Sequence, residues 1–108
     1  MDKTIRRSRA EGSVTAPSSK SYAQRAVAAA LLCEGTSTLT NMILCDDTRA
    51  ALQVAADLGA EVEAGTDGTT YTVRGGLRPH AQAIHIGESG LAARLFTPIA
   101  ALCGERIT

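Results

Sequence analysis

The stretch Ser18–Arg25, with the sequence SSKSYAQR, places two cations at the start of a predicted helix that is otherwise almost wholly apolar. The free N–H groups make a helix N-terminus electropositive, so Lys20 and Arg25 are unfavourable there unless an anion lies between them. Lys20 supplies a compact charge, Ser21 a hydroxyl donor and Arg25 a planar fork suited to an oxyanion. The sequence therefore predicts a phosphate or carboxylate site at this helix start. The alternative is a capped helix whose cations pair with Asp or Glu elsewhere in the chain.

Patterns of apolar residues, glycine and proline predict that strands and helices alternate along the chain. The expected strands cover residues 14–16, 36–41, 61–64, 69–74, 83–86 and 106–108, and the expected helices run from Ser18 or Ser19 to Cys33, from Asp46 or Asp47 to Leu58, and from Ser89 to Cys103. The predicted fold class is α/β, made of repeated βαβαββ units, with one unit and the start of a second in this chain. The first helix is apolar beyond Arg25 and is expected to be buried on nearly all sides.

A second strand-to-helix corner lies at Gly87–Arg94, with the sequence GESGLAAR. Gly90 lets a ligand approach the backbone closely, and Arg94 faces that point from one turn further along the helix. Aligning Arg94 with Arg25 places Gly90 on Ser21, which indicates a weak internal repeat. A tight turn between a strand and a helix is the alternative explanation of this segment.

Two other groups of charged residues have simpler interpretations. Asp46 and Asp47 are explained by helix capping more readily than by paired acid–base chemistry. Arg6, Arg7 and Arg9 are typical of a solvated tail or an edge strand.

Composition limits the classes of function. The 108 residues suit one domain or a piece of a larger one, with 44% hydrophobic and 20% charged residues. Aromatic residues make up only 3%, so the helices must pack closely through small side chains. The formal net charge of +0 argues against general attraction to nucleic acid or to a membrane surface. Any anion must therefore be bound by a local arrangement of charges.

Cysteine usage and the N-terminus predict the compartment. Cys33, Cys45 and Cys103 are odd in number and widely spaced, and the two histidines have no companions at metal-ligand spacing. We expect reduced, buried thiols, no metal and no cofactor. The first residues carry charges with no apolar segment behind them, and no apolar run is long enough to span a bilayer. The predicted localisation is cytoplasmic.

Three segments together resemble motifs of the enolpyruvyl transferase family, and most closely those of its 5-enolpyruvylshikimate-3-phosphate synthases. These are Pro17–Ser21 followed by Arg25, similar to P-[GP]-S-K-S-x-x-x-R; Glu34–Ser37, Asn41 and Asp46–Thr48, similar to E-G-x-S…N…S-D-D-T; and Gly87–Arg94, similar to G-N-[SA]-G-T-x-x-R. The first motif is specific and the last is degraded. The similarity runs from about Gly12 to Thr108.

The resemblance implies a transferase of the shikimate pathway, which leads through chorismate to the aromatic amino acids. Such an enzyme joins phosphoenolpyruvate to shikimate 3-phosphate and releases phosphate, without a metal or other cofactor. By the matching positions, Lys20 contacts both substrates as an electrostatic group, and Ser21 and Arg25 hold shikimate 3-phosphate. Gly90 lies against phosphoenolpyruvate, and Arg94 supports that side.

The chain departs from the family pattern at two positions and in length. Glu88 stands where the family usually has Asn, and Leu91 stands where it usually has Thr. Family members are several times longer, with two domains that close over the substrates and supply the proton-transfer carboxylates. We therefore expect residues 1–108 to be an incomplete first domain of a two-domain enzyme, with no complete second domain and no activity alone. The rest of its own chain is then a partner in the site.

Two other functions remain open at this point. One is the related transferase that acts on UDP-N-acetylglucosamine, although Ser21 and Arg25 at this spacing favour the shikimate enzyme. The other is a non-catalytic anion-binding module that keeps the corner of the fold without the chemistry.

Overall fold

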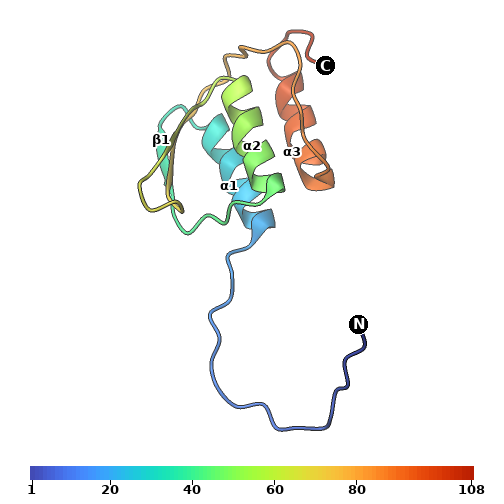
Figure 1. The fold of residues 1–108 in the computed structure, drawn as a ribbon. Coiled ribbons are helices and arrows are strands. Elements are labelled where there is room, and N and C mark those ends of the chain that lie inside the picture. The colour runs from blue at the N-terminus through green and yellow to red at the C-terminus, as the bar shows by residue number, and fades with distance from the viewer.

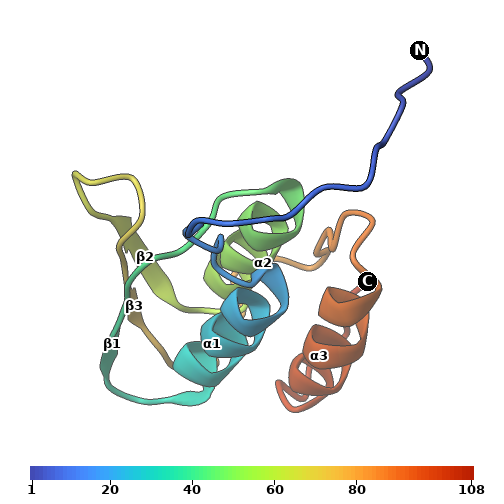
Figure 2. The same ribbon diagram turned by 90° about the horizontal axis from the view of Figure 1, so that it is seen from below.

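A computed structural model describes all 108 residues and contains three helices and a three-stranded sheet. The elements, in chain order, are α1 Lys20–Leu32, β1 Thr36–Leu39, α2 Asp46–Asp57, β2 Glu61–Ala64, β3 Tyr71–Arg74 and α3 Gly90–Ala101. Figures 1 and 2 show three layers: the sheet, the pair α1 and α2 against it, and α3 on the far side of that pair. The structure is mixed α/β, as the sequence predicts.

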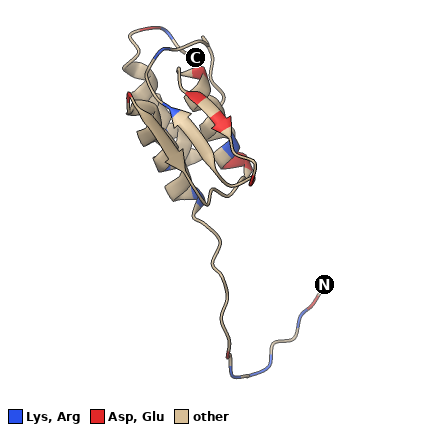
Figure 3. Cartoon of the chain, turned by 90° about the vertical axis from the view of Figure 1, so that its left-hand side faces the viewer, with Lys and Arg blue, Asp and Glu red and all other residues tan.

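The sheet has the order β1-β3-β2, and the central β3 is antiparallel to both neighbours. The register pairs Val73 with Ser37 on one side and with Val62 on the other. Tyr71 and Val73 are buried because alternate side chains of β3 face the helices. The opposite face is solvated and carries charged residues (Figure 3). Arg74 Nη1 lies 3.9 Å from Glu61 Oε2 across the neighbouring strands β3 and β2.

The core lies between the sheet and the helices and is rich in alanine, as the low aromatic content predicts. Phe96 of α3 is its largest fully buried side chain, and Leu31 and Leu58 close it near the ends of α1 and α2. The expectation that α1 is buried on nearly all sides is wrong. One side of α1 faces solvent, and Leu32 on it is 48% exposed, because the layers cover only the remaining faces.

Side-chain caps set the helix starts. The Ser19 hydroxyl accepts the Tyr22 N–H at 3.3 Å, so Ser19, one of the two predicted candidates, is the N-cap of α1. The N-cap of α2 is Cys45, which corrects the prediction that Asp46 or Asp47 holds that place. The Cys45 N–H donates to Thr48 Oγ1 at 2.9 Å, and this contact places the N-cap one residue before Asp46.

Three predicted strands are absent as strands. Residues 14–16 belong to an extended N-terminal segment that leaves the body of the molecule and has no pairing partner (Figure 1). Residues 83–86 and 106–108 are also irregular. Even so, the Ile84 N–H donates to the Thr108 carbonyl and the Thr108 N–H donates to the Gln82 carbonyl, both at 2.9 Å. These two hydrogen bonds form one parallel bridge between the segment before α3 and the segment after it. The arrangement is thus β-α-β, with its strands reduced to a single bridge.

The cysteines and the helices correct or limit two further expectations. All three cysteines are free, but Cys33 is exposed and Cys45 and Cys103 are half-buried, so the prediction of buried thiols is wrong. No helix of the chain has the length and apolar character needed to cross a bilayer.

The turn between β2 and β3 depends on one carboxylate, which generates a prediction. Asp67 Oδ1 accepts the N–H groups of Thr69 and Thr70 at 2.9 and 2.8 Å, and Oδ2 accepts the Thr70 hydroxyl at 2.7 Å. These bonds, the Thr70 hydroxyl first, lower the pKa of Asp67 from 3.8 to about 2.

We predict that an NMR titration of the Asp67 carboxyl carbon gives a pKa of about 2 and that Thr70→Val raises this pKa. Because the folded pKa is depressed, the stabilisation is present above the unfolded pKa near 3.8 and is lost as the pH falls through about 2. Thr66→Val is the matched control, since Thr66 donates no hydrogen bond to Asp67. An unchanged Asp67 pKa in Thr70→Val would contradict the assignment.

Candidate functional site

The three helices all begin at the same end of the molecule (Figures 1 and 2). The N-caps of α1, α2 and α3 are Ser19, Cys45 and Ser89. Side-chain contacts join the first two turns of α1 to the start of α2 and to the start of α3. The first turn of each helix points N–H groups without an intrahelical acceptor at this end, so the positive ends of three helix dipoles (three helix poles) lie side by side. This shared end is the candidate anion site.

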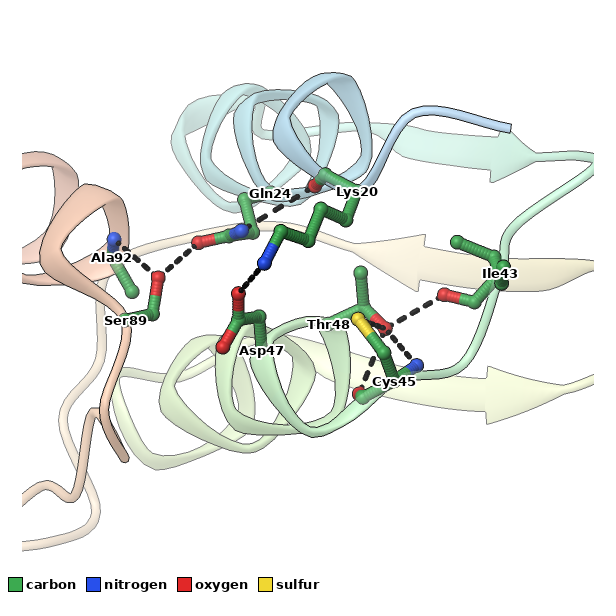
Figure 4. Close-up of polar contacts among 8 residues, drawn as sticks. All are labelled: Lys20, Gln24, Ile43, Cys45, Asp47, Thr48, Ser89 and Ala92. Atoms are coloured by element: carbon green, nitrogen blue, oxygen red, sulfur yellow. Dashed lines mark hydrogen bonds and ion pairs between the residues drawn. The ribbon is translucent and has the colours of Figure 1, made fainter. Parts of the chain in front are cut away.

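Lys20, the first residue of α1, forms an ion pair across the shared end. Its Nζ lies 2.8 Å from Asp47 Oδ2 in the first turn of α2 (Figure 4). The Lys20 side chain is 61% exposed and that of Asp47 is 23% exposed. The hydrogen bond and the charge of Asp47 raise the pKa of Lys20 above its ordinary value of 10.5. Lys20 therefore pairs with an acid elsewhere in the chain, which is the alternative that the sequence left open for the cations.

Ser21 and Arg25 lie on the same helix but have no anionic partner within the chain. Ser21 is half-buried, whereas Arg25 is exposed and belongs to none of the three ion pairs. The Arg25 guanidinium lies over the Tyr22 ring at 6.0 Å from its centroid, a cation–π contact one turn along the helix. The guanidinium is thus close to the shared end, with its hydrogen-bond donors facing solvent.

The second predicted corner begins α3. Gly90 is the first residue of that helix, and Arg94 folds back so that its Nη1 donates to the Gly90 carbonyl at 3.4 Å. A Cβ at Gly90 would make only an ordinary contact with Arg94 Nη1, at 3.4 Å, so this arrangement does not itself require glycine. Glu88, just before the Ser89 cap, is exposed and belongs to no ion pair.

The caps correct the internal alignment of the two corners. Arg25 comes six residues after its N-cap Ser19, but Arg94 comes five residues after its N-cap Ser89. By cap position, Arg94 therefore corresponds to Gln24 and not to Arg25. One residue turns a helix by about 100°, so the two arginines project from different faces of their helices.

Gln24 itself is the residue that sequence reasoning missed. It is 1% exposed, and its Oε1 accepts the Ser89 hydroxyl proton at 2.7 Å, which joins α1 to the start of α3 (Figure 4). The available signal was one polar residue on the inward face of an alanine-rich helix. The partner, Ser89, was predicted only as the start of the third helix, and nothing in the sequence joined it to a residue 65 positions away.

Thr48 and Cys45 shape the start of α2. The Thr48 hydroxyl donates to the Ile43 carbonyl at 2.7 Å, while its oxygen accepts the Cys45 N–H (Figure 4). The hydrogen bonds from Thr48, with a smaller one from the Asp47 N–H, lower the pKa of the Cys45 thiol from 9.0. These contacts fix the turn that brings Asp47 to Lys20.

None of the surface hollows encloses the five predicted site residues. A polar hollow lined by Glu34, Glu61, Arg74 and Arg78 lies at the opposite end, where α1 finishes. The predicted residues Lys20, Ser21, Arg25, Gly90 and Arg94 lie instead on open surface around the shared end. The arrangement can attract an anion, but this chain alone does not surround one.

Comparison with known proteins gives a consistent match. The sequence profile of the family described as EPSP synthase (3-phosphoshikimate 1-carboxyvinyltransferase) matches residues 5–108. A 3-phosphoshikimate 1-carboxyvinyltransferase of Methanothermobacter thermautotrophicus is 38% identical over 103 residues, which are 94% of this chain and 25% of the relative. A pentafunctional AROM polypeptide of Schizosaccharomyces japonicus is 39% identical over 95 residues, covering 85% of this chain and 6% of the relative.

A solved structure agrees with the sequence matches. The EPSP synthase from Acinetobacter baumannii superposes with a TM-score of 0.68 at 32% identity, over 80% of this chain and 20% of that one. The chain thus spans about a quarter or less of the length of these relatives.

The Lys20–Asp47 pair generates a prediction about titration. We predict that Asp47→Asn moves the pKa of Lys20 down toward 10.5, as followed by NMR of the lysine side chain against pH. Because the folded pKa is raised, the stabilisation by the pair is full below the unfolded pKa and is lost as the pH rises through the folded value. Asp46→Asn is the control, since Asp46 forms no ion pair with Lys20. Equal Lys20 titrations in Asp47→Asn and the parent would disprove the pairing.

Proposed function

Because this chain belongs to the EPSP synthase (3-phosphoshikimate 1-carboxyvinyltransferase) family, we propose that it forms one wall of a site that transfers the enolpyruvyl group of phosphoenolpyruvate to shikimate 3-phosphate. The observation that carries the proposal is the shared end, where three helix poles and the cations of the family motifs lie together. Both substrates are anionic, and such an end favours negative charge.

Each proposed role follows from the chemistry of the side chain. Lys20, with three N–H donors, can keep Asp47 and still donate to a substrate oxygen, so Asp47 holds its ammonium over the start of α1. Ser21 and Arg25 bind shikimate 3-phosphate through a hydroxyl and a planar fork. Gly90 lets phosphoenolpyruvate approach the first turn of α3, and Arg94 supports that side.

The reaction places demands on charge that these residues can meet. A hydroxyl of shikimate 3-phosphate loses its proton as its oxygen bonds to the enol carbon of phosphoenolpyruvate, and the neighbouring CH2 carbon takes a proton to become a methyl group. Loss of a proton from this methyl group then restores the double bond and expels phosphate. The adduct keeps its carboxylate and phosphate charges close together, so fixed cations such as Lys20 stabilise it electrostatically. The groups that move the protons belong to the remainder of the enzyme.

The share of its relatives' length that the chain spans supports a proposal about its domain. We propose that residues 1–108 are an incomplete first domain of a two-domain enzyme and that they are inactive alone, because the chain spans about a quarter of its relatives. The enzyme acts in the cytoplasm, in the shikimate pathway of aromatic amino-acid biosynthesis. The relatives described above are named for the shikimate reaction, so neither transfer to UDP-N-acetylglucosamine nor a non-catalytic anion-binding module is favoured.

The test is a titration of the complete enzyme with shikimate 3-phosphate. Lys20→Ala and Arg25→Ala each remove a charge-assisted contact, so we predict a loss of binding on the order of 1.5–3 kcal/mol, or about 10- to 150-fold in Kd. Arg74→Ala is the control, because Arg74 is also an exposed arginine but lies at the opposite end of the molecule. Unchanged affinity in both site variants would remove the assigned roles.

A further inference from the structure

A buried polar chain joins the two corners of the shared end. Gln24 and Ser89 are 1% and 6% exposed, and together with Thr48 they are the buried polar side chains of the molecule. Their bonds run from the Lys20 carbonyl to the Gln24 amide, on to the Ser89 hydroxyl and then to the Ala92 N–H (Figure 4). A buried polar group is costly unless it is hydrogen-bonded, so these contacts hold a defined geometry.

The donor pattern allows one orientation of the Gln24 amide. The Ser89 oxygen accepts the Ala92 N–H at 3.1 Å, which leaves its proton for Gln24 Oε1 at 2.7 Å. Gln24 Nε2 then faces the Lys20 carbonyl at 3.4 Å. Reversing the amide would place a carbonyl against a carbonyl and leave the serine proton without an acceptor. The link is therefore directional and sensitive to the length of the side chain.

The link also connects the residues that the proposed function uses. On α1 it ends at the backbone of Lys20, and on α3 it ends at the cap immediately before Gly90. Gln24 is too deeply buried to touch a substrate. Its amide spans the interface between the two helices and so fixes how far the Lys20 corner lies from the Gly90 corner.

We propose that Gln24 is a positioning residue, which through Ser89 holds the shikimate 3-phosphate corner and the phosphoenolpyruvate corner in register. The inference rests on the proposed function and adds a residue that contacts neither substrate. Reaction requires the hydroxyl oxygen and the enol carbon to be held about 3–3.5 Å apart in the reactive orientation, and misplacement by about 1 Å costs roughly a hundredfold. A loosened link therefore reduces turnover more than it reduces binding of shikimate 3-phosphate alone.

The experiment compares Gln24→Leu with the parent in the complete enzyme. Leucine has nearly the same volume and no polar group, and the Ser89 cap of α3 remains. We expect kcat/KM for phosphoenolpyruvate to fall roughly 10- to 100-fold, while the Kd of shikimate 3-phosphate alone changes less than about twofold. If Gln24→Leu fails to fold, Gln24→Met, with an unbranched side chain of similar length, takes its place.

Leu58→Ala separates positioning from general loosening. Leu58 is 0% exposed at the far end of α2, so its truncation weakens the core without touching the link. Positioning is supported if Gln24→Leu has a lower kcat/KM although its Tm is at or above that of Leu58→Ala, and if Leu58→Ala remains active. Kinetics of Gln24→Leu within twofold of an active parent, or a failure of both Gln24 variants to fold, would overturn it. No turnover by the parent would instead reject the proposed function.

Discussion

The structure depends on the packing of three helices with their N-termini at one end. Like poles side by side repel, so this arrangement must be offset by packing and by charge. Asp46 and Asp47 in the first turn of α2 supply part of the negative charge. Lys20 and Arg25 on α1 add positive charge at the same end, and Asp47 pairs with only one of them. These two acids and two cations balance in charge, so the positive field that an anionic ligand would neutralise is that of the three helix N-termini.

Backbone contacts secure the opposite end of the molecule. The Gly76 N–H donates to the Leu31 carbonyl at 2.8 Å and so satisfies the end of α1. A Cβ on Gly75 would come within 2.0 Å of the Ala30 carbonyl oxygen, so only glycine allows β3 to continue so close to α1. Main-chain contacts thus fix the opposite end. At the shared end the helices are joined by side-chain contacts, namely the Lys20–Asp47 ion pair and the Gln24–Ser89 hydrogen bond.

Local patterns predicted the helices, the hairpin and the α/β class, because caps, glycines and apolar periodicity act within a few residues of one another. They failed where the outcome depends on distant partners. Residues 14–16 have strand-like composition but no neighbouring strand. Asp47 was predicted as a helix cap, but it forms an ion pair with Lys20, which lies 27 residues away in the sequence. Gln24 gave only a weak signal for the same reason. The family motifs predicted residues that lie around the shared end, but not how they are linked.

The most direct test of the account is a crystal structure of the complete enzyme with shikimate 3-phosphate bound. We predict the phosphate at the shared end, within hydrogen-bond distance of the Ser21 hydroxyl and the Arg25 guanidinium, with Lys20 donating to substrate. The Gln24–Ser89 bond should persist in that complex. A phosphate bound elsewhere, for example between Arg74 and Arg78 at the opposite end, would contradict the claim that the three helix starts form the anion site.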